Sequence, residues 1–127
     1  MPKCFRNKTI VLTLCLKDPT DIFRNIIKAH AGKALFVDFW ATFCGPCRGG
    51  IEHTAGLRQQ YKDHPEFQFI YITSDRESPE KTYNEYVEKN LKGEACYRIP
   101  QADYNYLRQL FHFNGIPHYE WIEKDGT

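Results

Sequence analysis

The sequence has no excess of charge of either sign. Its 17 Lys and Arg residues balance 16 Asp and Glu residues, which leaves a formal net charge of +1. The charges are mixed along the chain, without the basic stripe of a nucleic-acid-binding protein or the long charged run typical of a disordered tail. The sequence therefore predicts no nucleic-acid partner.

Long apolar runs are also missing. The apolar run near the N-terminus, residues 9–16, has eight residues and is followed at once by Lys17 and Asp18. A membrane-spanning helix needs about 20 residues, so no membrane span is predicted. The basic residues before the run give it a faint likeness to a signal peptide. However, no small-residue cleavage site follows, and Leu14 precedes Cys15 where a lipoprotein signal has a small residue. We expect a β-strand here.

Metal ligands in useful spacings are scarce. Of the five cysteines, Cys44 and Cys47 form a CxxC, Cys4, Cys15 and Cys96 stand alone, and no two of the five histidines have zinc-finger spacing. The odd number leaves at least one cysteine unpaired or paired between molecules. A structural zinc site usually adds a second ligand pair to a CxxC, so no metal is predicted. A CxxC alone leaves a redox pair, half a zinc site or chance open.

The chain does contain an alternation of strand-like and helix-like segments, without internal repeats, in what we expect to be one domain, residues 1–127. Such alternation predicts an α/β layer fold. The expected strands are residues 9–16, 34–40, 67–73, 95–99 and 119–123, and the expected helices are 21–30, 48–63, 79–90 and 102–112. The side chains expected to face inward on the second and fourth of these helices are Ile51, Leu57, Tyr61, Leu107, Leu110 and Phe111.

The CxxC stands where an apolar strand turns into a helix. Unpaired N–H groups and the helix dipole at a helix N-terminus favour an anion, so Cys44 should be the attacking thiolate with a lowered pKa. Cys47 lies within the first turn and can close on Cys44. Pro46 keeps that turn rigid and helps to start the helix.

Asp38 interrupts the apolar strand six residues before Cys44. Burial of a carboxylate is costly, and a buried one tends to stay protonated instead. The alternative is an aspartate at a strand end that local hydrogen bonds satisfy. We expect Asp38 to be buried and to have a functional role.

Two motifs resemble those of a known family. Residues 36–47, Phe-Val-Asp-Phe-Trp-Ala-Thr-Phe-Cys-Gly-Pro-Cys, resemble the active-site segment of the thioredoxin superfamily, and Gly115-Ile116-Pro117 resembles its cis-proline loop. Residues 71–75, 78–80 and 92–94 (Tyr-Ile-Thr-Ser-Asp, Ser-Pro-Glu and Lys-Gly-Glu) are similar to the TlpA/ResA-like branch found in Bacteroidetes-type extracytoplasmic proteins. The resemblance covers residues 20–126. It implies a thioredoxin-like fold, a central mixed sheet flanked by helices, with an extra helix and strand inserted between Ser78 and Ile99.

The resemblance also implies roles for individual residues. Cys44 attacks, Cys47 resolves, and Asp38 takes the proton of Cys47, so Asp38→Asn should slow release of the mixed disulfide. Pro117 should be cis and lie against the disulfide, while the backbone of Ile116 pairs with an extended substrate. Trp40 packs beneath the site, and Phe43 stands where the family commonly has Trp. The implied substrate-binding set is Trp40, Phe43, Gly45, Pro46, Ile116 and Pro117.

Three features depart from the family pattern. Glu52 stands where a kink-forming proline is common, and Gly49 and Gly50 weaken the helix, so a straighter or more mobile helix is expected. The chain ends at Thr127 in a predicted hairpin turn, where the family continues into a final strand and a C-terminal helix. We therefore expect a C-terminally truncated fragment or a short variant. Its last strand should present an unpaired edge, and homodimerisation through that edge is a hypothesis.

These observations predict a thiol–disulfide oxidoreductase that reduces protein disulfides through Cys44 and Cys47, because the Gly-Pro dipeptide resembles reducing members of the family. The resemblance implies no cofactor, protein disulfides as substrates, an upstream electron-donor protein, and a periplasmic or otherwise extracytoplasmic location. The alternative of another class is a redox-silent thioredoxin-like binding module of a larger protein. A zinc protein is the third candidate.

Overall fold

The computed structural model describes residues 19–124. The strand expected at residues 9–16, together with Cys4 and Cys15, lies outside this range. The described chain runs through α1 (Pro19–Ala29), β1 (Ala34–Phe39), α2 (Gly45–His53), α3 (Ala55–Gln60), β2 (Phe67–Ser74), α4 (Glu80–Asn90), β3 (Ala95–Ile99), α5 (Gln101–Leu110) and β4 (His118–Ile122). The expected helices and strands within this range are thus present, and α4 and β3 are the extra helix and strand expected between Ser78 and Ile99.

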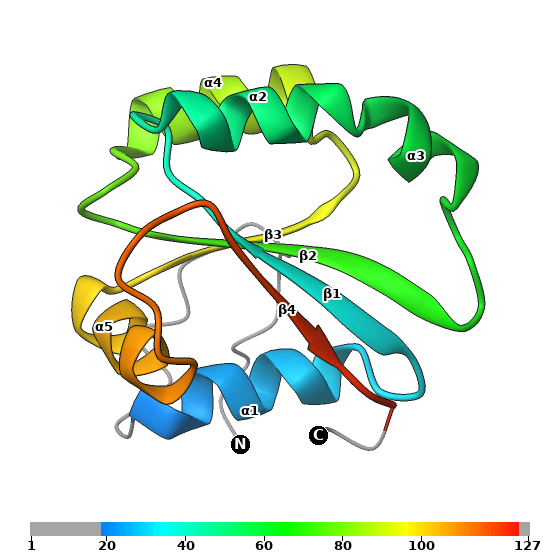
Figure 1. Ribbon diagram of the computed structural model, residues 1–127, viewed down its shortest axis with the longest axis horizontal. Helices are drawn as coiled ribbons and strands as arrows, with labels where there is room; N and C mark the ends of the chain where they lie inside the picture. The colour runs from blue at the N-terminus through cyan, green and yellow to red at the C-terminus, as the bar shows by residue number, and fades with distance from the viewer. Residues whose placement is uncertain (1–18, 125–127) are drawn as a thin grey trace.

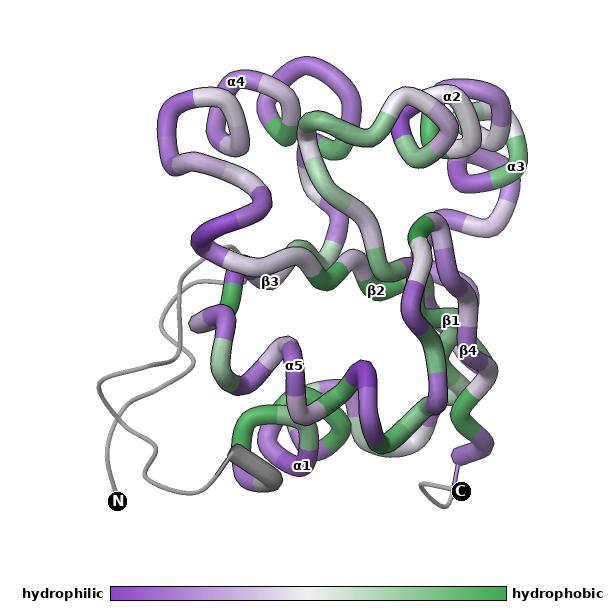
Figure 2. The backbone as a smooth tube through the Cα atoms, turned by 60° about the vertical axis from the view of Figure 1, so that its left-hand side comes forward, coloured by the Kyte–Doolittle hydropathy of each residue, from purple (hydrophilic) through white to green (hydrophobic). Residues whose placement is uncertain are grey.

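The four strands form one mixed sheet in the order β3-β2-β1-β4. β1 pairs in parallel with β2, β2 in parallel with β3, and β4 runs antiparallel to β1. Helices α2, α3 and α4 cover one face of the sheet, and α1 and α5 cover the other (Figure 1). Figure 2 shows the same three layers from the side, with the sheet between the two helical layers.

The sheet is buried on both faces, which explains the nearly continuous apolar sequence of β1. Leu35, Val37 and Phe39 face α1 and α5 and join the core that contains Ile22, Ile26 and Leu107. The next residue, Trp40, belongs instead to the core beneath α2 and α4, together with both cysteines of the CxxC. The redox pair is therefore built on a packed layer rather than on a free loop.

The helix after the CxxC differs from the expectation. It begins at Gly45 rather than near Arg48, and it is interrupted at Thr54 instead of running unbroken to residue 63. At the break, the carbonyl oxygen of Ile51 accepts hydrogen bonds from Thr54 Oγ1 at 3.3 Å and from Arg58 Nη1 at 2.6 Å. Two polar side chains thus bind the same backbone carbonyl oxygen at the interruption.

The side chains that face inward on α2, α3 and α5 differ in part from the expected ones. Ile51 is buried as expected, but Leu57 is 46% exposed and Arg58 is buried in its place. On α5, Leu107 is buried as expected, whereas Leu110 is 46% exposed. The expected inward positions of Leu57 and Leu110 are therefore wrong. Arg58 follows Ile51 by seven residues and shares its helical face, so the wrong position for Leu57 came from its apolar character and not from the helical period.

The two glycines after Cys47 sit in different surroundings. A Cβ atom at Gly49 would meet nothing within 4 Å, whereas one at Gly50 would lie 3.1 Å from the hydroxyl of Tyr119. Gly49→Ala should raise the free energy of unfolding by about 0.5–1 kcal/mol, because alanine is the better helix former. Gly50→Ala should gain less, because Tyr119 must shift. Urea denaturation of both variants tests this difference, and equal gains would contradict the close approach of Tyr119.

β4 lies at an edge of the sheet, and among residues 19–124 no strand pairs with its outer side. Tyr119 and Trp121 on this strand are 43% and 49% exposed. Together with Leu57 they border an apolar pocket of about 360 Å³ that reaches Asp38. No helix in the described part of the chain has the length and apolar character needed to cross a membrane.

Candidate active site

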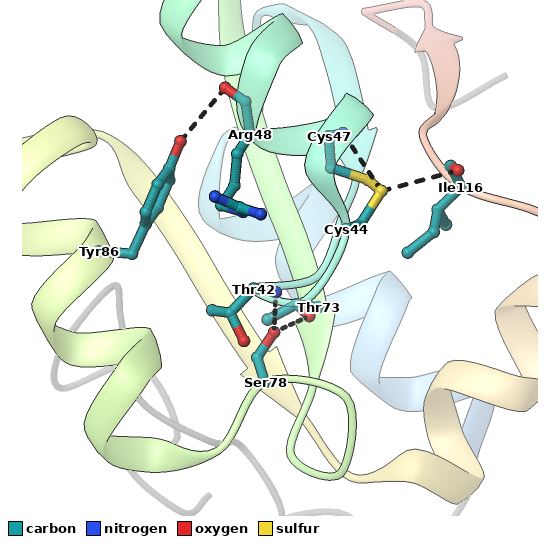
Figure 3. The surroundings of a disulfide bond; sticks show 8 residues. All are labelled: Thr42, Cys44, Cys47, Arg48, Thr73, Ser78, Tyr86 and Ile116. Atoms are coloured by element: carbon teal, nitrogen blue, oxygen red, sulfur yellow. Dashed lines mark hydrogen bonds between the residues drawn. A yellow bond between two sulfur atoms is a disulfide. The ribbon is translucent and has the colours of Figure 1, made fainter.

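The CxxC forms the first turn of α2. Cys44 is the N-cap residue, with an extended backbone, and its Sγ accepts a hydrogen bond from the backbone N–H of Cys47 at 3.2 Å. Pro46 lies in the first turn, where a missing N–H leaves no helical bond unmade. Cys44 and Cys47 form a disulfide, with their Cα atoms 5.2 Å apart (Figure 3). The helix N-terminus thus points at the sulfur that was predicted to attack.

The two sulfurs differ in access. Cys44 retains 7% of its surface, whereas Cys47 retains 1%. Cys44 Sγ lies 3.8 Å from the carbonyl oxygen of Ile116, and the Ile116–Pro117 peptide bond is cis. Phe43, next to Cys44, is 67% exposed. The structure therefore places the Ile116–Pro117 loop and an exposed aromatic ring beside the more accessible cysteine.

Ser78, to which the sequence analysis gave no role in the site, supports the loop before the CxxC. Ser78 is fully buried, and its Oγ accepts a hydrogen bond from the backbone N–H of Thr42 at 3.1 Å. The same oxygen lies 2.7 Å from Thr73 Oγ1 (Figure 3). The loop is thus tied to the end of β2. The only signal was a polar Ser-Pro step after a buried strand, which usually marks a helix start.

Asp38 lies on the face of the sheet that α2 covers, and it lines the apolar pocket together with Gly50 and His53 of that helix. It is buried, and its Oδ1 has no hydrogen-bond partner among residues 19–124. Desolvation raises the pKa of Asp38 from 3.8 to about 7, against the opposing effect of the positive charge on Arg58. This carboxyl can therefore bind or release a proton near neutral pH.

Trp40 is fully buried beneath the CxxC layer, where it packs against Tyr83 and Tyr86. Tyr86 in turn donates a hydrogen bond from its hydroxyl to the carbonyl oxygen of Arg48 at 3.3 Å (Figure 3). The helix α4 therefore braces α2 one residue after Cys47. The position of Trp40 is that of a support, without surface for a substrate to touch.

His118 directly follows Pro117 in the sequence, which makes it a candidate either for tuning Cys44 or for a solvated side chain without a role. Its ring stacks on Phe113 at 4.2 Å between centroids, and its Nε2 lies 2.6 Å from Glu120 Oε2. It is paired with Phe39 in the sheet register, and so it faces the α1 and α5 side. These contacts hold the ring away from the layer that contains the CxxC.

The described part of the chain has no cluster of metal-binding side chains. No group of three or more His, Cys, Asp or Glu side chains between residues 19 and 124 is arranged to hold an ion. Cys96 is a free, fully buried thiol, and desolvation raises its pKa. It behaves as a small apolar side chain of the core beneath α4.

The mixed sheet, the two helical layers and the disulfide at the start of α2 define a thioredoxin-like protein with a CxxC redox pair. A family model described as thioredoxin-like matches residues 32–127. The chain belongs to this family.

Individual relatives agree with this assignment. Over 58 residues the chain is 41% identical to thioredoxin-3, mitochondrial, of Saccharomyces cerevisiae, a match that covers 46% of this chain and 41% of that protein. The chain therefore spans about two fifths of the length of this curated relative.

Solved structures show the same fold. One is the thioredoxin domain of a thiol-disulfide oxidoreductase from Bacteroides vulgatus, with a TM-score of 0.67 and 21% identity over 78% of this chain and 69% of that one. Another is a thiol:disulfide interchange protein from Bacteroides sp., with a TM-score of 0.66 and 22% identity over 80% of this chain and 63% of that one. At such identities the likeness shows the fold alone. Together with the family match and the Cys44–Cys47 pair, it supports a redox protein in general terms.

Proposed function

We propose that this protein is a thiol–disulfide oxidoreductase that reduces disulfides in other proteins. The observation that carries the proposal is the Cys44–Cys47 disulfide at the N-terminus of α2, with Cys44 the more exposed of the two cysteines. A helix N-terminus stabilises a thiolate, and a thiolate with access to solvent is the nucleophile of disulfide exchange.

In the reducing direction, the Cys44 thiolate attacks one sulfur of a substrate disulfide. The substrate S–S bond breaks, a mixed disulfide forms at Cys44, and one substrate thiolate leaves. Cys47 then loses its proton and attacks Cys44 Sγ, which breaks the mixed disulfide and releases the second substrate thiolate. The electron pair has passed from the two cysteines to the substrate, and Cys44 and Cys47 are oxidised.

Asp38 is the group that we propose as acceptor of the Cys47 proton. It lies under α2, and its pKa of about 7 lets the carboxylate form accept a proton near neutral pH. The carbonyl of Ile116, beside Cys44, would pair with the extended backbone of the substrate, and Phe43, Gly45, Pro46 and Pro117 would line that contact.

The partners follow from the chemistry. A protein dithiol must return the electron pair to the oxidised cysteines, and protein disulfides are the substrates. The TlpA/ResA-like resemblance favours an extracytoplasmic location, where disulfides persist. A homodimer through the exposed edge of β4 remains our hypothesis.

The reduction of insulin disulfides tests the proposal. Wild-type protein with dithiothreitol should accelerate insulin precipitation over dithiothreitol alone, and Cys44→Ser should abolish the acceleration, because the nucleophile is gone. Cys96→Ser is the matched control, since it also removes one thiol but leaves the redox pair intact. An inactive, folded wild-type chain would instead favour the redox-silent binding module. Stoichiometric zinc in the purified protein would favour the third candidate.

A further inference from the structure

Arg58 is a cation buried in the helical layer beside the redox site. Its position on α3 leaves only 6% of its surface exposed, far less than that of the apolar Leu57 beside it. A guanidinium group keeps its charge in proteins, and burying that charge is costly unless it is compensated. The burial of this charge therefore needs an explanation other than side-chain packing.

The hydrogen-bond partners of Arg58 are neutral. Nη1 donates to the carbonyl oxygen of Ile51 at 2.6 Å and to Thr54 Oγ1 at 3.0 Å, and Nη2 donates to the carbonyl oxygen of Asn90 at 3.2 Å. Within the described chain, the one carboxylate at ion-pair distance from it is that of Glu94, 4.0 Å from Nε. These bonds fix the group in place but leave much of its charge available to other neighbours.

That charge lies next to the residue paired with Asp38. The Cζ atom of Arg58 lies 5.8 Å from the centroid of the Tyr71 ring, which is 3% exposed. Tyr71 is the β2 partner of Asp38 in the sheet register, and both line the apolar pocket. A cation over this ring acts on Asp38 through protein rather than water, where charges interact more strongly. In agreement, Arg58 lowers the pKa of Asp38 against the effect of desolvation.

The other titratable groups near Asp38 do not supply a second buried positive charge. They are Tyr71 on β2, Tyr104 on α5, Tyr119 on β4, Cys96 on β3, His53 on α2 and Glu94 just before β3. Desolvation raises the pKa of the three tyrosines and the cysteine, so these groups are uncharged near neutral pH. His53 is exposed, and Glu94 has the opposite charge.

We propose that Arg58 is a positioning residue of the redox site, whose guanidinium, held over the Tyr71 ring, sets the pH range in which Asp38 accepts the proton of Cys47. The assignment of that proton to Asp38 rests on the proposed function. The electrostatic link between Arg58 and Asp38 does not, since it is a property of the oxidised, resting protein. Arg58 thus acts from α3, outside the CxxC and outside the strand that carries Asp38.

The test is the titration of the Asp38 carboxyl in the oxidised full chain, followed by carbon NMR. The signal is assigned by its loss in Asp38→Asn. Arg58→Gln should move the midpoint of Asp38 upward by on the order of one pH unit. Arg58→Lys should retain most of the wild-type midpoint, because the positive charge stays. Lys62→Gln, which removes one exposed positive charge two residues beyond α3, is the matched control and should leave the midpoint unchanged.

The outcomes separate the inference from the proposed function. If Arg58→Gln leaves the Asp38 midpoint at its wild-type value, or if Lys62→Gln moves it equally, the inference is wrong even when the protein reduces insulin. A shifted midpoint in a protein that fails to reduce insulin would uphold the link and overturn the function. Should Arg58→Gln not fold, Arg58→Met decides, because it keeps the apolar stem and removes the charge. It should move the Asp38 midpoint upward, and no movement would refute the link.

Discussion

Replacing Asp38 with asparagine should remove most of the pH dependence of stability between pH 4 and pH 8. In the folded protein the pKa of Asp38 is raised from 3.8 to about 7 by desolvation. Between these values the folded chain holds a proton that the unfolded chain has released, so wild-type stability falls as pH rises. The shift corresponds to a loss of about 4 kcal/mol across the window, complete above about pH 7. The asparagine side chain of the variant cannot ionise, so the variant does not undergo this part of the loss.

Urea denaturation of the oxidised proteins at several pH values measures this effect. The difference in unfolding free energy between Asp38→Asn and wild type should change by about 4 kcal/mol in favour of the variant from pH 4 to pH 8. Asp63→Asn removes an exposed carboxylate and should reproduce the wild-type slope. Parallel curves for wild type and Asp38→Asn would show that Asp38 does not titrate as a buried acid.

The positions of Cys44, Cys47 and Asp38 could be predicted because short, local sequence patterns determine them. The apolar strand, the CxxC and the following helix are contiguous, and so the positions of Cys44 at the helix start and Cys47 in its first turn follow from residues 34–47 alone. Asp38 stood out because a carboxylate in a strand buried on both faces is rare. The spatial meeting of Ile116 with Cys44, more than 70 residues apart, came only from the family resemblance.

The electrostatic surroundings of the site were not predictable from the sequence. Leu57 was expected in the core because it is apolar, and Arg58 was not, because a charged side chain is normally exposed. Arg58 nevertheless follows Ile51 by seven residues and so shares its helical face. The carbonyl oxygens of Ile51 and Asn90 offer acceptors to its buried guanidinium. Such acceptors exist only once two helices and a sheet have assembled.

The hydrogen bond that holds the loop before Cys44 also forms only when the fold has assembled. Ser78 binds the Thr42 backbone across 36 positions of the sequence, a contact that no local pattern encodes. The sequence thus located the disulfide pair and the buried carboxyl, and the structure added the residues that hold the loop before them.

Substituting Cys47 with serine should convert the protein into a trap for its substrates. Cys44 keeps its helix N-terminus and its exposure, so it still attacks a disulfide and forms the mixed disulfide. The buried sulfur that would release the product is gone, and serine is far too weak a nucleophile to replace it. We expect the covalent adduct with a disulfide substrate to accumulate to near stoichiometry, whereas wild type shows almost none.

The measurement is the mass of the reduced protein after incubation with a disulfide-containing peptide, without added thiol. Cys47→Ser should gain the mass of one half of the peptide disulfide, and dithiothreitol should remove it. Cys44→Ser is the matched control: it retains Cys47, which is 1% exposed, and should form at least about tenfold less adduct, because the remaining sulfur is shielded from solvent. Equal adduct on the two variants would refute the assignment of Cys44 as the attacking sulfur, and adduct only on Cys44→Ser would reverse the two roles.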